Sequence, residues 1–395
     1  MQSKEYFQKF RNEIPALERC VYLNTAGSGP LPLPALHAIT DSYNRLAYFG
    51  QTNADLISDN KARLEVVRKN IANFVKAKAE EIFFVRCIAE AVNTVAYMID
   101  WKPGDEVIIS DQENPATILP FLNLKKKGII IKKLHITTDQ GEMLQSFKTL
   151  LTEKTRLVMI CQVMHAIGVR LPIKEMAAAA HEKGILFAVD AAQSVGVVPV
   201  DVHDLGCDFY MLASHKWIMG PEGATAVYIK EELVGKMDPP FAGVGTEASF
   251  DLDNDTMVYK PGVAKYEYGG RHLSLYFGMD KAVDLLERIG IDEVYGRSLQ
   301  LGAYFREKLS KVPGLTVLNP YSQEYGSGIV SFKVQGMDHR DFTKKAWKEG
   351  QIIINWRTID LHTKEEGIRT SMAWFLKEEE LDYFVDYLGY YLSKA

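Results

Sequence analysis

A lysine and an aspartate follow two apolar runs that read as neighbouring strands. Asp190 ends the run 185–190, and Lys216 comes shortly after the run 209–213. The carboxyl ends of neighbouring parallel strands meet at one edge of a sheet, so the amine and the carboxylate would lie close together. A pyridoxal 5'-phosphate (PLP) enzyme requires this pair, because the amine forms a Schiff base with the aldehyde and the acid pairs with the pyridinium nitrogen. The two residues therefore predict PLP chemistry.

The residues around Lys216 favour a pocket over a solvated surface. His215 and Trp217 flank the lysine, and a Gly-Pro-Glu-Gly turn follows. A lysine in a partly dry pocket has a lowered pKa, so the free amine that attacks an aldehyde becomes populated. An isolated lysine is usually a surface group, and Asp190 alone could cap a helix. Gln193, three residues after Asp190, is placed to hydrogen-bond the hydroxyl of the cofactor ring.

Short apolar runs alternate with amphipathic stretches over the first two thirds of the chain. The runs lie at 82–85, 106–109, 129–131, 157–160, 185–189 and 209–212. Strands that alternate with helices predict an α/β fold with a mainly parallel sheet covered by helices on both faces. Ligands of such sheets bind beyond the carboxyl ends of the strands, where the aspartate and the lysine are expected.

The pattern changes near residue 269. Amphipathic stretches over about 275–309 predict long helices, and shorter apolar runs separated by further helical stretches follow them. We therefore expect a large PLP-binding domain over 20–275 and a small α+β domain made of 1–19 and 276–395. A chain of 395 residues is long enough for one large and one smaller core.

The composition is that of an ordinary globular protein, with 47% hydrophobic and 25% charged residues. The net charge of -5 gives no reason to expect a nucleic acid or an anionic membrane as a partner. No run approaches the roughly 20 apolar residues of a membrane span, and the N-terminus has no signal-peptide core. The four cysteines and nine histidines are scattered, so we predict no metal site. A cytoplasmic location with free thiols is expected.

Taken together, the motifs resemble the class V aminotransferases of PLP fold type I, a family that includes cysteine desulfurases, isopenicillin N epimerase-like proteins and kynureninases. The resemblance runs over almost the whole chain. The segments that carry it are 22–30, 90–93, 103–107, 113–121, 189–194, 215–223 and 368–371. It implies a sheet of the seven-stranded type, PLP as cofactor, and a homodimer with shared active sites in which residues 241–272 reach across the subunit boundary.

The resemblance implies roles for the residues around the cofactor ring. Lys216 would form the Schiff base and shuttle protons. Asp190 would pair with the ring nitrogen and Gln193 with the ring oxygen, while His215 would face the phosphate or the ring. Where the family often has an asparagine near the ring oxygen, this chain has His165, which could equally be a buried core histidine.

The resemblance also implies a substrate side. Arg369, in an Ile-Arg-Thr-Ser strand, would bind the α-carboxylate of an amino acid through a bidentate fork that a lysine cannot copy. Asn24 and Ala26 would lie in the N-terminal loop on the substrate side. An asparagine before a glycine-rich turn is also commonly structural.

The expected phosphate loop departs from the family pattern. The family usually has glycine and threonine here, but this chain has Cys87, Ile88 and Ala89, so backbone N–H groups at a helix start would have to bind the phosphate. A phosphate-binding serine often precedes the family lysine by three residues. This chain has Ala213 there, with Ser214 shifted by one.

Two further positions also differ from the family. A threonine that a neighbouring subunit often lends is Gly270 here, and Arg271 is expected to compensate. The residue that stacks on the ring, usually histidine or an aromatic, is Asn114. These differences leave Lys216 and Asp190 in place but predict fewer contacts to the phosphate, and hence weaker cofactor affinity.

Several reactions fit these residues. The stretch 355–367 contains no cysteine, which disfavours desulfuration through a persulfide on a mobile loop. Transamination, epimerisation and β-elimination each begin when Lys216 removes the α-proton of an amino acid. We expect an aminotransferase or epimerase-like activity. The alternatives are a PLP-dependent β-lyase, meaning a C–S lyase without a catalytic cysteine, and a non-catalytic relative of the fold. A nicotinamide-binding enzyme is disfavoured because the G-x-G-x-x-G turn is missing.

Overall fold

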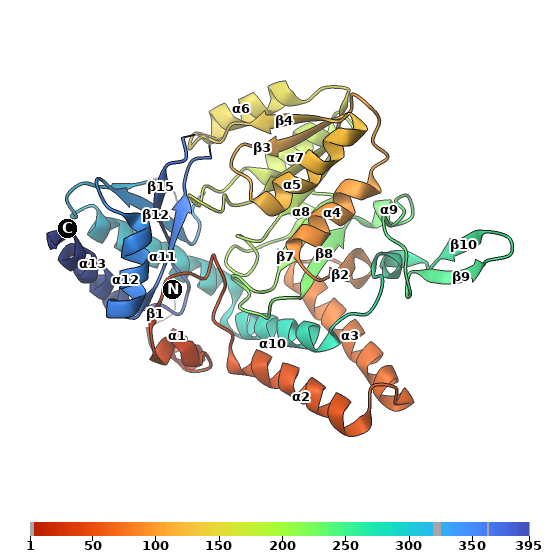
Figure 1. Cartoon of the computed structure of the whole chain (residues 1–395), viewed down its shortest axis with the longest axis horizontal. Coiled ribbons are helices and arrows are strands. Elements are labelled where there is room, and N and C mark those ends of the chain that lie inside the picture. Colours follow the sequence, from red (N-terminus) through yellow and green to blue (C-terminus); the bar gives the residue numbers. More distant parts are fainter. Residues whose placement is uncertain (1–3, 319–324, 362, 395) are drawn as a thin grey trace.

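The structure is a computed structural model that describes residues 4–318, 325–361 and 363–394 (Figure 1). Within these ranges the largest sheet has seven strands in the order β2-β8-β7-β6-β5-β3-β4. Strand β8 runs antiparallel to β2 and β7, and the other neighbouring pairs run parallel. The strands span Ile82–Val85 (β2), Glu106–Ser110 (β3), Ile130–Leu134 (β4), Thr155–Cys161 (β5), Leu186–Asp190 (β6), Phe209–Ala213 (β7) and Thr225–Ile229 (β8). The predicted α/β fold with a mainly parallel sheet is confirmed.

The large sheet is buried on both faces, which explains its continuous apolar runs. Along β6, Phe187 and Val189 belong to one apolar cluster, whereas Ala188 belongs to the cluster on the opposite face, as the period-two alternation of a strand requires. Helices α6 (Gln140–Leu150) and α7 (Ile173–His181) contribute Met143 and Met176 to the first cluster, while α4 (Ile88–Met98) and α5 (Pro115–Leu124) contribute to the second. A sheet sandwiched in this way needs apolar side chains on both of its faces.

The helices lie around the large sheet and beside a second, small sheet (Figure 1). Helix α10 packs against α2 and α3, while α11, α12 and α13 pack together at the small sheet. The α-helices of the described chain span Lys4–Arg11 (α1), Leu33–Phe49 (α2), Ala54–Phe74 (α3), Ile88–Met98 (α4), Pro115–Leu124 (α5), Gln140–Leu150 (α6), Ile173–His181 (α7), Val202–Leu205 (α8), Glu231–Val234 (α9), Leu273–Ile289 (α10), Ile291–Leu309 (α11), His339–Gly350 (α12) and Glu378–Ser393 (α13).

A second sheet, antiparallel throughout, follows in the order β11-β12-β15-β14. Its strands span Leu315–Val317 (β11), Ile329–Val334 (β12), Asn355–Thr358 (β14) and Glu366–Ser371 (β15). This agrees with the predicted small α+β region. The division at residue 275 stays a prediction, because that position lies inside α10, which contacts helices from the first part of the chain.

Two short strand pairs complete the fold. Strand β1 (Val21–Tyr22) pairs in parallel with β13 (Ile352–Ile353), so the N-terminal segment is joined to the small α+β region. Strands β9 (Glu247–Asp251) and β10 (Thr256–Tyr259) form a hairpin that projects from the body of the molecule (Figure 1).

The described residues contain no helix that is long and apolar enough to cross a membrane. Nor do they gather three or more histidine, cysteine, aspartate or glutamate side chains in an arrangement that could hold a metal ion.

Candidate active site

Lys216 lies in a tight turn directly after β7. The carbonyl of Ser214 accepts a hydrogen bond from the Gly220 N–H at 2.9 Å, and that of His215 accepts one from the Gly29 N–H at 2.7 Å. Burial, together with two nearby arginines, lowers the pKa of Lys216 to about 8, although Asp190 opposes this shift. The turn therefore holds an amine that is partly unprotonated near neutral pH, as a nucleophile for an aldehyde must be.

Asp190 is buried at the end of β6, and both of its oxygens are held. Its Oδ1 accepts the N–H of Ala192 at 2.9 Å, and its Oδ2 accepts the hydroxyl of Thr117 at 3.2 Å. Thr117 comes from α5, so two elements fix the orientation of one carboxylate. Thr117 lies in the segment 113–121, but its role could not be predicted from the sequence, because its contact with Asp190 spans 73 positions of the chain.

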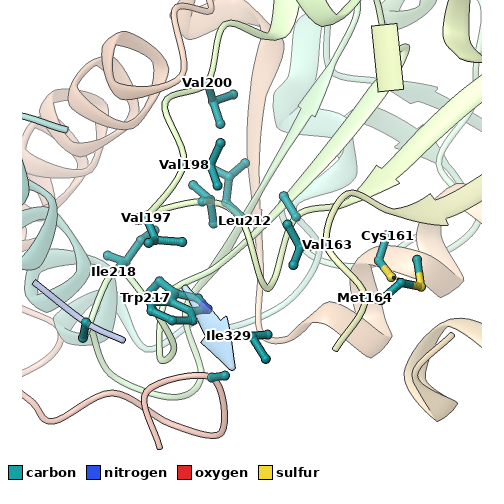
Figure 2. Close-up of a cluster of buried hydrophobic side chains, with 14 of the residues drawn as sticks. Cys161, Val163, Met164, Val197, Val198, Val200, Leu212, Trp217, Ile218 and Ile329 are labelled. Atoms are coloured by element: carbon teal, nitrogen blue, oxygen red, sulfur yellow. Dashed lines mark hydrogen bonds between the residues drawn. The ribbon is translucent and has the colours of Figure 1, made fainter. Parts of the chain in front are cut away.

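The amide of Gln193 connects the lysine turn with the N-terminal loop. Its Nε2 donates to the carbonyl of Ala26 at 3.0 Å, and its Oε1 accepts the indole N–H of Trp217 at 3.0 Å. Figure 2 shows Trp217 near Ile218 and Ile329 in the apolar core. One N–H of Gln193 remains available for a ligand. Ala26 therefore positions another residue through its main chain, which its apolar side chain could not have indicated.

Arg369 is 1% exposed in the middle of the small sheet and points to the same site. Its Nη1 donates to the carbonyl of His165 at 2.9 Å, and its Nη2 donates to Oδ1 of Asn24 at 3.3 Å. Its Nε is buried without a hydrogen-bond partner among the described residues. Burial and the charge of Arg357 lower the pKa of Arg369 to about 9. The structure thus brings the predicted substrate-side residues together.

Arg357, on β14, is a second arginine of the site that sequence analysis did not find. Asn355 pairs with Arg369 across the two strands, and Arg357 follows two positions later, so the two guanidinium groups leave the sheet from the same face. Burial lowers the pKa of Arg357, and its Nε has no hydrogen-bond partner within the described chain. Neither arginine forms an ion pair with a described carboxylate, so the site holds uncompensated positive charge that favours an anionic ligand.

His165 lies on a turn after β5, close to these cations. Burial, Arg369, Arg357 and Lys216 together lower its pKa to about 3, so the imidazole is neutral. Its Nδ1 is buried without a partner in the described chain, and the main chain of Gln112 hydrogen-bonds the ring. The structure therefore places His165 at the site and not in a remote part of the core. A contact with a cofactor oxygen stays a prediction.

The expected phosphate loop forms the start of α4. Cys87 is the N-cap residue and makes no side-chain cap hydrogen bond, and Ile88 begins the helix. Cys87 and Ala89 are exposed. The first N–H groups of a helix are free to bind an anion, and the helix dipole favours negative charge there. The geometry is therefore compatible with phosphate binding by the main chain of residues 87–89, which stays a prediction.

Ser214 and His215 differ in how they could reach a ligand. The Oγ of Ser214 is fully buried and has no partner among the described side chains and main-chain groups. A Cβ atom on Gly220 would lie 2.1 Å from that hydroxyl, which shows that it packs against the turn. His215 is half-buried, and burial together with Lys216 lowers its pKa. The shifted serine thus packs inside the protein, whereas the histidine keeps partial access to solvent.

Gly270 and Arg271 precede α10. Gly270 is exposed, and a Cβ atom added there would meet no heavy atom within 4 Å. Arg271 forms an ion pair with Glu267, a buried residue that also binds Arg68 at 2.7 Å and the N–H of Phe84 at 2.8 Å. Arg271 is therefore engaged within its own chain, and its predicted compensation for the missing threonine is untested.

Asn114 and Glu113 connect β3 to α5. Asn114 is the N-cap of α5 and accepts the N–H of Ala116 at 3.0 Å, so its amide stabilises a helix end. Stacking of this amide on a cofactor ring stays a prediction. Glu113 is fully buried and accepts the hydroxyl of Ser110 at 2.8 Å and the N–H of Cys161 at 3.0 Å. Burial raises the pKa of Glu113 to about 7.

Comparison with known proteins agrees with this geometry. The sequence profile described as "Aminotransferase class-V" matches residues 21–384. A probable cysteine desulfurase of Methanothermobacter thermautotrophicus is 28% identical, with 94% of each chain covered. Among solved structures, the apo cysteine desulfurase of Thermococcus onnurineus NA1 has a TM-score of 0.90 at 25% identity, with 98% of both chains covered.

A second solved protein in this comparison, the cystine C–S lyase C-DES, has a TM-score of 0.87 at 26% identity in complex with its reaction product cysteine persulfide. The match covers 95% of this chain and 98% of that one. A lysine variant of C-DES, with glycine covalently linked to its PLP cofactor, has a TM-score of 0.88 at 26% identity over 96% of this chain and 98% of the other.

The partly buried lysine, the aspartate held beside it and the profile match over most of the chain have one explanation. The chain belongs to the class V aminotransferase family and is a PLP-dependent enzyme. The residues present fit the cofactor: Lys216 would hold it covalently, Asp190 would face the ring nitrogen, and the spare N–H of Gln193 would reach the ring oxygen.

Proposed function

We propose that this enzyme is a PLP-dependent C–S lyase. It would release a sulfur group from the β-carbon of an amino acid whose leaving half carries a second acidic group, as cystine does. The observation that carries the proposal is a pair of neighbouring arginines, the buried Arg369 and the partly buried Arg357, which have no carboxylate partner among the described residues. Removing unpaired cations from water is costly, and two carboxylates of one substrate would offset that cost.

Two further observations support this choice over the aminotransferase or epimerase-like activity expected from sequence. The compared proteins named above are cysteine desulfurases and a cystine C–S lyase. The connection between β14 and β15, where a desulfurase would need its cysteine, has none. The thiol of Cys161 lies near Lys216, but burial and the charges of Glu113 and Asp190 raise its pKa well above the ordinary value. It would therefore be a poor nucleophile.

The residues divide the work of such an elimination. Bound PLP withdraws electrons from the substrate α-carbon and so acidifies the α-proton. Arg369 would hold the α-carboxylate and Arg357 the acid of the leaving half. Lys216, released from its covalent role, would take the α-proton as the Cβ–S bond breaks with its electron pair on sulfur. Water would then convert the remaining three-carbon fragment to pyruvate and ammonia.

A substrate panel tests this proposal. The PLP-loaded enzyme would be given L-cystine, L-cysteine, or L-alanine with a 2-oxo acid, and pyruvate, ammonia, amino transfer and racemisation would be followed separately. We expect pyruvate and ammonia from L-cystine in equal amounts, and none from the Lys216→Ala variant. The proposal is wrong if the wild type transaminates or racemises amino acids but forms no pyruvate from any sulfur substrate.

A matched pair of variants tests the second arginine. Arg357→Gln should raise the KM for L-cystine at least tenfold, because one ionic hydrogen-bonded contact to the substrate is worth about 1.5–3 kcal/mol. Arg357→Lys, which keeps the charge, should lose less. Equal KM values for L-cystine in wild type and Arg357→Gln would remove Arg357 from substrate binding.

A further inference from the structure

His165 is held rigidly between the two sheets. It lies on a turn in which the Gly168 N–H donates to the Met164 carbonyl at 2.8 Å. Ser331 of β12 donates to the carbonyl of Ala166 at 2.6 Å, and Arg369 donates to the carbonyl of His165 itself. The main chain that carries the imidazole is therefore fixed against the arginine that would hold the substrate.

The imidazole of His165 lies in a positively charged environment. It is a titratable ring beside three groups that carry or can carry positive charge: Lys216 after β7, Arg357 on β14 and Arg369 on β15. From the connection before α5 it meets the main chain of Gln112. Its Nδ1 is buried and has no hydrogen-bond partner in the described chain. A ring nitrogen in that state is ready to receive a proton if the local charge changes.

We propose that His165 takes up a proton when a substrate with two acidic groups occupies Arg357 and Arg369, and that it then delivers this proton to the leaving sulfur. This inference rests on the proposed function. In the free protein burial of the ring and the charges of Arg369, Arg357 and Lys216 together keep the imidazole neutral. Two bound carboxylates would cancel much of that field, and the pKa would rise toward the ordinary value of about 6.5.

The proton balance of the step is closed. One proton enters the ring from solvent as the two carboxylates of the substrate bind to the arginines. Lys216 takes the α-proton, the Cβ–S bond breaks with its electron pair on sulfur, and the sulfur receives the proton held by His165. Lys216 then gives the α-proton to Cβ of the three-carbon fragment, which water converts to pyruvate and ammonia. The imidazole is neutral again when the product leaves, and departure of the substrate acids restores the repulsive field. His165 is thus protonated only while substrate is bound.

Proton uptake can be measured without turnover. Suberate has two carboxylates at the same separation in bonds as those of cystine, but it has no amine and no sulfur. Its binding to PLP-loaded enzyme at pH 6 would be followed by titration calorimetry in buffers of different ionisation enthalpy. We expect uptake of up to about three quarters of a proton per site in the wild type, the value for a pKa of about 6.5 at pH 6, and close to none in His165→Gln, whose amide does not titrate.

Three outcomes would overturn the inference. They are suberate binding to the wild type without proton uptake, equal uptake in His165→Gln, and no binding of suberate at all, which would mean that the arginines do not form a site for two acids. None of these outcomes depends on whether the enzyme releases pyruvate. The binding experiment can therefore refute proton uptake by His165 independently of the assay for lyase activity.

A leaving-group comparison adds a readout that a purely structural role would not give. Two S-(carboxyaryl)cysteines would be used, one with an acidic leaving thiol and one with a weakly acidic one. His165→Gln should lose at least 100-fold in kcat on the weakly acidic thiol, the usual scale of general acid catalysis, and less than tenfold on the acidic thiol. Equal losses on both substrates would contradict acid catalysis by His165.

Discussion

The amine of Lys216 is influenced by charges of both signs. Asp190 raises its pKa, whereas burial, Arg369 and Arg357 lower it, and the balance is about 8. Since only the neutral amine attacks an aldehyde, covalent attachment of PLP to the apo enzyme should accelerate as the pH rises through about 8 and then level off. The rate is measured from the change in PLP absorbance between pH 6 and 10, with Lys216→Ala as the control that attaches none.

The arginines make this pH dependence adjustable. Arg357→Gln removes a positive charge that disfavours the protonated amine, so the pKa of Lys216 should rise and the midpoint should move to higher pH. Arg357→Lys keeps the charge and should leave the midpoint near its wild-type value. Identical midpoints in wild type and Arg357→Gln would show that Arg357 does not act on the lysine.

Thr117 orients Asp190, the acid that would face the ring nitrogen. Thr117→Val removes the hydroxyl that Asp190 accepts at 3.2 Å. A hydrogen bond to a charged group is worth about 1.5–3 kcal/mol, so we expect PLP to bind at least tenfold more weakly. Thr117→Ser keeps a hydroxyl and should restore most of the affinity. The measurement is a PLP titration followed by absorbance, and unchanged affinity in Thr117→Val would rule out the orienting role.

At the residue scale, the sequence reveals the lysine and the acid because each lies in a local motif at the end of an apolar run. The partners of these residues could not be predicted in the same way. Thr117 meets Asp190 and Arg357 acts on Arg369 only through the fold, and nothing in the local sequence of either one indicates the contact. The predicted cofactor contact of Ser214 stays a prediction, since its hydroxyl is buried and has no hydrogen-bond partner within the described chain.

At the scale of elements, the lysine turn depends on a close approach by the N-terminal loop. A Cβ atom on Gly29 would lie 2.3 Å from the carbonyl oxygen of Lys216, which is backbone and cannot move aside cheaply. Gly29→Ala should therefore displace the turn, lower the free energy of unfolding by about 1–3 kcal/mol and impair attachment of PLP. Urea unfolding and PLP absorbance measure the two effects.

A glycine in open space provides the control. Gly296 lies in α11, and an added Cβ atom there would meet nothing within 4 Å. Gly296→Ala should be neutral or stabilising by up to about 1 kcal/mol, because alanine favours a helix. Equal stability of the two variants would show that the contact at Gly29 does not constrain the turn.

Glu113 joins the ends of β3 and β5 as a buried carboxyl. Its pKa is about 7 in the folded protein, above the ordinary 4.5, so the folded state binds the proton more tightly than the unfolded state. The resulting stability is fully present below pH 4.5 and is lost as the pH rises through about 7. Its slope is at most about 1.4 kcal/mol per pH unit.

Two variants isolate this contribution. Glu113→Gln, which cannot titrate, should flatten the fall in unfolding free energy between pH 4.5 and 7, whereas Glu153→Gln at an exposed position should leave the wild-type profile unchanged. Urea unfolding of the apo protein across this range measures both. A wild-type slope that persists in Glu113→Gln would assign it to another group.

The elements themselves followed from the sequence where burial on both faces gave continuous apolar runs, as in β2, β3 and β7. The small sheet was harder to predict in detail. Strand β14 has no strongly buried position, so its pairing with β15 and the placement of Arg357 had no apolar signal. Element type can be predicted from periodicity, but partner choice between distant short strands cannot.

At the scale of the whole molecule, we propose a two-fold homodimer, as the family resemblance implies. The β9–β10 hairpin projects with Phe250, Leu252, Met257 and Val258 between 43% and 83% exposed. Clustered apolar side chains on a projecting element mark an association surface. Phe250→Asp combined with Leu252→Asp should shift the protein toward monomer in sedimentation velocity, whereas Tyr390→Asp on α13 should not. A wild type that sediments as a monomer at micromolar concentration would refute the proposal.

The loop that follows β1 links three parts of the molecule through hydrogen bonds. The carbonyl of Leu23 accepts the N–H of Ser371 on the small sheet, Ala26 receives the side chain of Gln193, and Gly29 donates to the carbonyl next to Lys216. The loop 23–29 thus hydrogen-bonds to the small sheet, to the segment after β6 of the large sheet, and to the peptide next to Lys216. Any tilt of one sheet against the other would pull on that peptide and so displace the amine of Lys216.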